Sequence, residues 1–290
     1  MITGMGGRGG AISSRSTGKQ DVSDRASNSD KVIRAIGGPH IATWLDSVFI
    51  QETDGGGIAH LAAVPKWEAK GGNSTGTQGT SAKRPTLDAF GINGRAAVKF
   101  DASNDGLVWA NGGLISTAQA AATVASTSRS SVSGNDSGII FELGTNNYHS
   151  VNGLIQAYST DNSDVDRRLL IGIGQDGDDS FELSTSERTP NIENVFVSVY
   201  DRSTNKDTLD GFINSEPITA VGESESANST GGFAFNNNTA NLGSRANGGS
   251  VPLNGHIREF VLINRKLLPA EAFRLSKALM SKSGITSLLN

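Results

Sequence analysis

Cysteine is absent from the 290 residues of the chain. Its absence excludes disulfide frameworks, zinc sites built on thiolates, thiol nucleophiles and iron–sulfur clusters together. Any fold must therefore rest on its hydrophobic core and its hydrogen bonds. The length allows one large all-β domain or two ordinary domains, because β-sandwiches often exceed about 200 residues as a single unit.

Long apolar runs and an excess of positive charge are also missing. No run approaches the roughly 20 apolar residues that cross a bilayer, and residues 1–15 lack the apolar segment of a signal peptide, so we expect neither a membrane protein nor ordinary export. Lys and Arg number 25 against 29 Asp and Glu, which gives a net charge of -4. Such a balance leaves no general basic surface, so nucleic acid is not an expected partner.

Glycine is abundant, with 36 residues, and it separates many short apolar runs. From Val98 onward these runs include AAVKF, TVAST, GIIFEL, RLLIGI, NVFVSVY, GFAF and HIREFVLI, with polar turn segments between them. This spacing is typical of a sandwich or barrel of β-strands. Val195, Val197 and Val199 share one face by the period-two alternation of a strand, so we expect them in the core.

The N-terminal segment has a different composition. Residues 1–40 contain MGGRGG at Met5–Gly10, followed by the polar stretch SSRSTGKQDVSDRASNSD, which offers no apolar face. Such a segment cannot bury enough surface to fold alone. We expect an extended Gly/Ser-rich assembly arm that docks on another subunit or another protein; the alternative is that it packs on its own domain.

The C-terminal segment predicts a short helix. Pro269 fits the first helical position, and Glu271 suits the positive end of the helix. Gly284 is placed to end the helix. Four residues fall on one face at helical spacing, namely Ala272, Leu275, Ser276 and Leu279. We expect two to three turns that cap an edge of the sandwich.

Three stretches carry a resemblance to a known family. They are WLDS at Trp44–Ser47 followed by Val64 and Trp67, then Gly71–Leu107, and then Asn241–Ile285. On these stretches the chain resembles the laminin-G-like and concanavalin-A-like jelly-roll domains found in bacteriophage structural proteins. The resemblance implies an all-β, antiparallel jelly-roll β-sandwich over residues 41–290. It says little about function, because this fold hosts sugar binding, adhesion, hydrolysis and scaffolding.

Segments that match enzyme motifs lack the surrounding structural elements that those motifs need. Gly172–Gly177 matches a dinucleotide fingerprint, but the strand-like DGDDSFEL follows it where a helix is needed. Gly72–Gly76 matches a nucleophile elbow around Ser74, but a polar loop surrounds it. Glu142 stands alone, and the odd spacing of Glu182 and Glu187 puts them on opposite faces of a strand, unlike the carboxylate pair of a glycosidase. We therefore expect no enzyme and no cofactor.

Metal and sugar sites are the remaining candidates. Two acidic loops have spacings like loose calcium loops, and we expect solvated turns, with a calcium site as the alternative; their residues are Asp161, Asp164, Asp166, Asp176, Asp178 and Asp179. The four histidines have no zinc-like spacing; they are His40, His60, His149 and His256. Trp44 and Trp67 are expected in the core. That leaves three aromatic residues as candidate sugar contacts, namely Trp109, Tyr148 and Tyr158.

These observations predict a structural rather than a catalytic role. A loop-rich sandwich without disulfides or a signal peptide suits a protein made in the host cytoplasm and released on the outer surface of a virion. We expect a non-enzymatic phage structural protein, such as a capsid-decorating component, that contacts other virion proteins through its arm and forms a homo-oligomer. The alternative is a carbohydrate-binding adhesin of a phage tail or a cell surface, with a glycan as its partner.

Overall fold

The computed structural model describes most of the chain after residue 26. The described residues are 27–50, 59–72, 74–109, 114–115, 119–131, 138–144, 152–159, 168–174, 180–184, 191–203, 207–218, 222–225, 234–235, 238–247 and 249–286. No helix in these ranges is both long and apolar enough to cross a membrane.

Strands dominate the described ranges. The strands are β1 (Ile41–Ile50), β2 (Lys66–Gly72), β3 (Gly76–Thr77), β4 (Thr86–Ile92), β5 (Arg95–Asp101), β6 (Leu107–Trp109), β7 (Ala121–Ser130), β8 (Gly138–Leu143), β9 (Leu154–Ser159), β10 (Arg168–Gly174), β11 (Ser180–Ser184), β12 (Asn194–Asp201), β13 (Thr208–Ile213), β14 (Glu216–Pro217), β15 (Gly222–Glu225), β16 (Ala240–Leu242) and β17 (Asn254–Ile263). The helices are α1 (Asn28–Gly37) and α2 (Pro269–Ser283), with 3-10 turns at η1 (Gly38–His40) and η2 (Ser81–Lys83).

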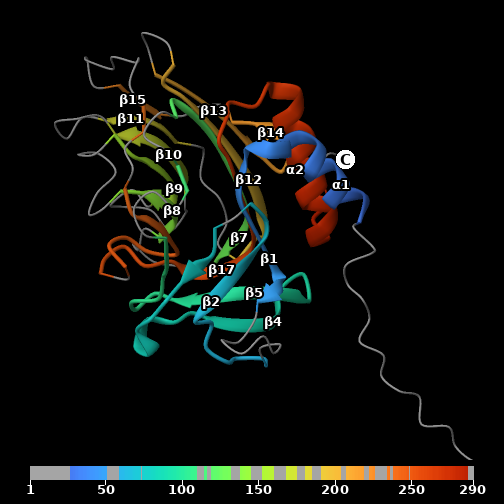
Figure 1. Ribbon diagram of the computed structural model, residues 1–290, viewed down its shortest axis with the longest axis vertical. Helices are drawn as coiled ribbons and strands as arrows, with labels where there is room; N and C mark the ends of the chain where they lie inside the picture. Colours follow the sequence, from blue (N-terminus) through green and yellow to red (C-terminus); the bar gives the residue numbers. More distant parts are fainter. Residues whose placement is uncertain are drawn as a thin grey trace, which may run out of the picture.

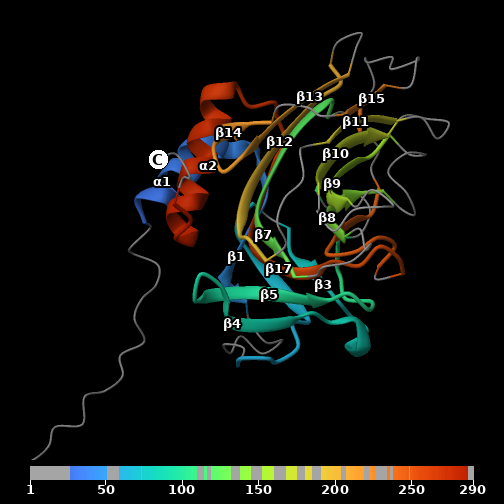
Figure 2. The same ribbon diagram turned by 180° about the vertical axis from the view of Figure 1, so that it is seen from behind.

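The strands form two facing layers, as Figures 1 and 2 show from opposite sides. In one layer β13, β12, β7 and β17 pair in that order. The other edge of β17 pairs with β5 along its first half and with β1 along its second half. In the other layer β16, β8, β9, β10, β11 and β15 pair in that order. Every pairing between the described strands is antiparallel, so the predicted antiparallel β-sandwich is confirmed.

The main core fills the space between the layers. Phe141 of one layer packs on Phe260 of the other, with ring centroids 4.9 Å apart, and Tyr158 meets Phe196 edge-on at 5.5 Å. Trp67 and Val64, from the stretches that carry the family resemblance, are fully buried in the same core. Close aromatic pairs of this kind add to the burial of apolar area, so they help to fix the two layers face to face.

Buried polar bonds set the register between the layers. Ser126 Oγ donates to Gln156 Oε1 at 2.7 Å, and Gln156 Nε2 donates to Ser198 Oγ at 2.7 Å. Gln156 belongs to β9, whereas its two partners belong to β7 and β12 of the opposite layer. A buried amide left without partners costs free energy, so any sliding of one layer past the other is opposed at this point.

The helices cover the outer face of the β12, β7 and β17 layer (Figures 1 and 2). Val195, Val197 and Val199 are buried there against α2, as their alternation predicts. The predicted helix starts at Pro269 and ends at Gly284, which adopts the left-handed conformation, and its four predicted packing residues are buried. The helix is longer than predicted, at 15 residues, and it covers a face of the sheet rather than an edge.

The N-terminal boundary of the sandwich differs from the prediction. Residues 28–40 are not extended, because Asn28–Gly37 forms α1 and η1 follows it. Ser27 caps the helix by accepting a hydrogen bond from the backbone N–H of Asp30, and Ile33 and Ile36 are buried against α2. Two apolar residues at i, i+3 spacing are enough when a neighbouring helix covers them. The rest of the proposed arm, residues 1–26, lies outside the described residues.

Two glycines with positive φ allow a matched test of the core. Gly94, in the turn between β4 and β5, has φ +68 and open space around it. Gly243 has φ +83, and a Cβ there would lie 2.0 Å from the ring of Phe100. Gly94→Ala carries only the left-handed backbone strain, about 1 kcal/mol.

We predict that Gly243→Ala lowers the free energy of unfolding more than Gly94→Ala, by an additional ~1–3 kcal/mol, because the added methyl overpacks the core against Phe100. Urea denaturation of the two variants measures the difference. Equal losses of stability in the two variants would contradict the packing described here.

Candidate functional site

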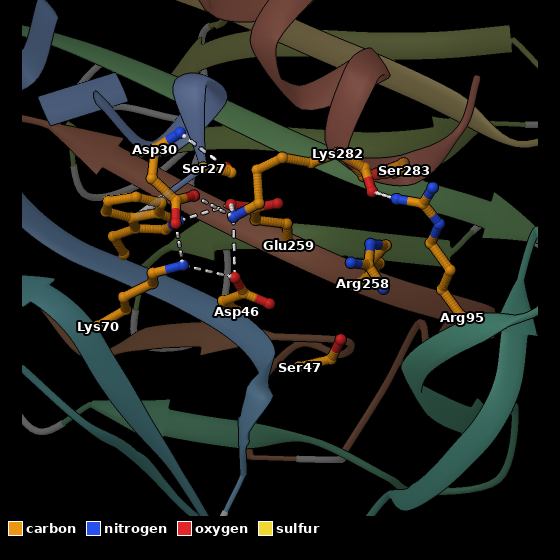
Figure 3. A network of polar contacts seen from close by, with 12 residues as sticks. Ser27, Asp30, Asp46, Ser47, Lys70, Arg95, Arg258, Glu259, Lys282 and Ser283 are labelled. Atoms are coloured by element: carbon orange, nitrogen blue, oxygen red, sulfur yellow. Dashed lines mark hydrogen bonds and ion pairs between the residues drawn. The ribbon is translucent and has the colours of Figure 1, made fainter. Parts of the chain in front are cut away.

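A buried network of charges joins the helices to the sheet (Figure 3). The Lys282 ammonium of α2 lies 2.8 Å from Asp30 Oδ1, 2.8 Å from Asp46 Oδ2 and 2.6 Å from Glu259 Oε1. Lys70 of β2 lies 2.7 Å from Asp30 Oδ2 and 3.0 Å from Asp46 Oδ2. These five residues, from α1, β1, β2, β17 and α2, are called the lysine network below.

Trp44 closes one side of the lysine network. Its indole Nε1 donates to Glu259 Oε1 at 2.7 Å, and the residue is fully buried, as expected from the sequence. The ammonium groups of Lys70 and Lys282 lie 4.8 and 4.9 Å from the centre of its ring. Trp44 therefore contributes both a hydrogen bond to the carboxylate and cation–π contacts to the two lysines.

Burial and charge pull the pKa values of the network in different directions. Burial raises the pKa of Glu259 to about 7. Burial would also raise the pKa of Asp46, but the charges and hydrogen bonds of Lys282 and Lys70 outweigh it and hold that pKa low. The contribution of Glu259 to the free energy of unfolding is therefore fully present below its ordinary pKa, and it is lost as the pH rises through about 7. Asp46 has the opposite dependence, because its contribution is lost in acid.

The lysine network has the features of a structural element rather than a binding site. Asp30, Asp46 and Glu259 form the group of three acids in the described ranges that lies close enough together to hold one metal ion. Lys70 and Lys282 already neutralise these carboxylates, and the Lys282 side chain is only 8% exposed. A metal ion would have to displace both ammonium groups. We infer that the network fastens α1 and α2 to the sheet.

Lys282→Met tests this structural role. We predict that it lowers the free energy of unfolding by about 3–5 kcal/mol, because it leaves Glu259 buried without a cation and leaves Asp46 with Lys70 as its remaining cation. Lys277→Met, on a more exposed face of the same helix, is the control and should change stability by about 0.5 kcal/mol or less. Chemical denaturation near neutral pH measures both variants. A Lys282→Met protein as stable as the control would show that the network does not hold the helices.

A second polar row crosses the outer face of the sheet, beyond the helices. Asp88 of β4 accepts a hydrogen bond from His256 Nε2 of β17, with 3.0 Å between the nitrogen and Asp88 Oδ2. On its other side, His256 Nδ1 lies 3.2 Å from a guanidinium nitrogen of Arg129 on β7. Arg129 in turn pairs with Glu193 at 3.3 Å. The row therefore brings residues from four distant parts of the chain onto one surface.

At the β4 end of the row, two rings and a carboxylate form an exposed corner. Phe90 is 71% exposed, and its ring meets the His60 ring at 61° with centroids 5.8 Å apart. Asp88 lies beside them: its Oδ1 accepts the backbone N–H of Phe90 at 2.9 Å and lies 3.8 Å from His60 Nδ1. We call His60, Asp88 and Phe90 the β4 corner.

Hydrogen bonds fix the protonation pattern of the corner. His60 Nδ1 accepts the backbone N–H of Ala89 at 3.1 Å, so a neutral His60 ring carries its proton on Nε2. Although burial opposes it, the N–H of Phe90 and the bond from His256 lower the pKa of Asp88. Burial, followed by the charge of Arg129, lowers the pKa of His256. At neutral pH Asp88 is thus an ionised carboxylate that accepts a hydrogen bond from the neutral imidazole of His256.

A close backbone approach shapes the corner. The register between β4 and β5 shifts between Asp88 and Ile92. Within this irregular segment, a Cβ on Gly91 would lie 2.7 Å from the ring of His256. The absence of a side chain at Gly91 lets β4 lie over His256, while Phe90 faces solvent.

The sugar contacts expected from the sequence are not exposed. Trp109 and Tyr158 are each 3% exposed. Trp109 packs toward Phe260, and the hydroxyl of Tyr158 lies 3.0 Å from Ser128 Oγ in the core. The prediction is wrong for Trp109 and Tyr158, because their side chains point into the core of the sandwich. Tyr148 lies outside the described residues, as do the acidic loops with Asp176, Asp178 and Asp179.

The structure describes parts of the segments that match enzyme motifs by their letters. Gly172 and Gly174 lie on β10, which pairs antiparallel with β11, and residues 175–179 between these strands lie outside the described residues. Ser74 lies between β2 and β3, and its carbonyl accepts a hydrogen bond from Thr43 Oγ1. Glu142 is fully buried and pairs with Arg245 at 3.0 Å. The described residues of the two glycine motifs thus lie on or between strands, and the carboxylate of Glu142 is held in an ion pair.

A shallow pocket of about 180 Å³ lies at the other end of the polar row. Its lining residues are Asn93, Ile192, Glu193, Asn214, Gly284, Ile285 and Thr286. Both amide groups are already used: Asn93 Nδ2 donates to Ser283 O at 3.2 Å, and Asn214 bonds to Val195 and Asn194.

Comparison with solved structures supports the fold. A Trypanosoma rangeli sialidase in complex with sialic acid aligns with a TM-score of 0.56 and 14% identity, over 84% of this chain and 33% of the sialidase. A botulinum neurotoxin serotype D/C binding domain aligns with a TM-score of 0.49 and 12% identity, over 83% of this chain and 52% of its own. The Ruminococcus gnavus IT-sialidase CBM40 aligns with a TM-score of 0.41 and 13% identity, over 55% of this chain and 83% of the CBM40 chain.

The alignment with the sialidase supports the class of fold. No protein-family model matches the chain, and no curated protein matches its sequence. The chain spans about a third of the sialidase that it resembles. At this low identity the likeness identifies an antiparallel jelly-roll β-sandwich, as the sequence predicts.

Proposed function

We propose that this protein is a non-catalytic carbohydrate-binding module and that the β4 corner contacts the sugar. The observation that carries the proposal is the exposed ring of Phe90 beside the ionised, oriented carboxylate of Asp88. The sequence favoured a virion structural protein, with carbohydrate binding as the alternative. The exposed corner favours that alternative.

The chemistry of the corner suits a pyranose ring. An apolar ring that faces solvent can stack on the C–H face of a sugar, and a carboxylate accepts hydrogen bonds from hydroxyl groups. In the described part of the chain, His60 Nε2 has no hydrogen-bond partner, so it can donate to a sugar oxygen. One stacking surface, one acceptor and one donor therefore meet at a single place.

Hydrolysis is a poorer match for the same corner. A glycosidase needs a carboxylic acid that holds its proton near neutral pH, and the pKa of Asp88 is lowered. The other carboxylate of the polar row, Glu193, is paired with Arg129 at the far end of the row. We therefore propose binding without bond cleavage.

The role in a virion remains a prediction from the sequence. It rests on the composition of residues 1–40, of which residues 1–26 lie outside the described residues, on the absence of cysteine and on the family resemblance. Carbohydrate binding and a place on a particle surface are compatible, since an adhesin can have both.

Phe90→Ala tests the proposed function. In a broad glycan panel read by ligand-observed NMR, the wild-type protein should bind at least one saccharide in the millimolar range or tighter. Phe90→Ala should weaken that binding about tenfold, because the stacking contact is lost. Phe273→Ala is the control, since Phe273 is 43% exposed and lies near the start of α2, away from the β4–β5 hairpin. Failure of the wild type to bind any glycan would refute the proposal, and so would equal binding by both variants.

A further inference from the structure

We infer that the β4 corner selects neutral pyranosides and discriminates against sugars that carry a carboxylate. This inference rests on the proposed function and names the class of ligand. It sets the corner apart from the sialidase that shares the fold, whose structure contains sialic acid.

The fixed charge at the corner is negative. Asp88 receives its hydrogen bonds from the N–H of Phe90 and from His256, and His60 lies 3.8 Å away. In the ranges that the structure describes, no lysine or arginine pairs with Asp88. Its side chain is 21% exposed, so a ligand stacked on Phe90 would meet this carboxylate directly. A second carboxylate there would be repelled, as like charges disfavour each other at short range.

The nearest cations are poorly placed to compensate. Recognition of a carboxylate favours a guanidinium that is free to form two parallel bonds. Arg129 is committed to Glu193 and His256. Lys99 is exposed and lies opposite Thr86 of β4 rather than opposite Asp88. Its flexible ammonium can offset part of the charge of Asp88, but it does not form the fork that an acidic sugar requires.

The groups that remain at the corner match neutral hydroxyls. The carboxylate of Asp88 accepts hydrogen bonds only, so it suits the hydroxyl groups of a sugar as donors. His60 supplies one donor through Nε2, because its Nδ1 accepts the backbone N–H of Ala89. The His60 and Phe90 rings meet at 61°, so a pyranose that stacks on Phe90 has the edge of His60 beside it.

Binding of matched neutral and acidic glycans tests the inference on the wild-type protein. A panel of lactose, maltose, cellobiose and mannobiose is compared with sialyllactose by isothermal titration calorimetry. We expect at least one neutral disaccharide to bind and sialyllactose to bind at least about tenfold more weakly than the best of them, the difference that a repulsion of roughly 1.4 kcal/mol produces. Binding of sialyllactose alone, lost in Lys99→Gln, would overturn the inference but leave the proposed function standing. No binding to any glycan would overturn both.

Asp88→Asn supplies the second arm of the test. It removes the charge and keeps a side chain of the same shape, with its melting temperature as a check on folding. The variant should bind the best neutral disaccharide about tenfold more weakly, because a charge-assisted hydrogen bond becomes a neutral one. Its preference for neutral sugars over sialyllactose should shrink. An unchanged preference in a folded Asp88→Asn protein would overturn the role given to this charge.

Discussion

The position of the two helices on the outer face of the sheet depends on the ammonium group of Lys282. This group joins carboxylates of α1, β1 and β17 at distances of 2.6 to 2.8 Å. Without α1 and α2, the valines of β12 and Phe212 of β13 would face solvent. Burial of this apolar face supplies most of the stabilisation, whereas the charges fix where the helices lie, since a buried cation tolerates few alternative positions.

The end of α2 links the lysine network to the β4 corner. Arg95 donates to the carbonyl of Lys282, and Asn93 Nδ2 donates to the carbonyl of Ser283 at 3.2 Å. Both residues belong to the hairpin of β4 and β5, and Asp88 and Phe90 lie on β4 of that hairpin. The helix end thus holds the hairpin against the sheet, and His256 of β17 supports Asp88 from beneath. A binding corner on an exposed strand is positioned in this way by the rigid part of the fold.

Features that depend on neighbouring residues in the sequence could be predicted from the sequence. The alternation at Val195–Val199 and the helix from Pro269 to Gly284 are both set by neighbours in the sequence, and the structure confirms them. The helix α1 was missed because its few apolar residues follow a long polar stretch. The lysine network could not be predicted, since its members come from five elements and meet only after folding. The exposure of Phe90 was missed for a similar reason, because it follows from the register shift in β4 and not from the residue type.

Fluorine NMR of the protein labelled with fluorophenylalanine tests the central claim most directly. The chain has 11 phenylalanines, and a conservative Phe90→Leu variant assigns the signal of Phe90. The account predicts that titration with the best-binding neutral saccharide shifts the Phe90 signal in a saturable way and leaves the signal of Phe273 in place. Saturable binding of the sugar with an unmoved Phe90 signal would contradict the account, because the sugar would then lie elsewhere on the protein.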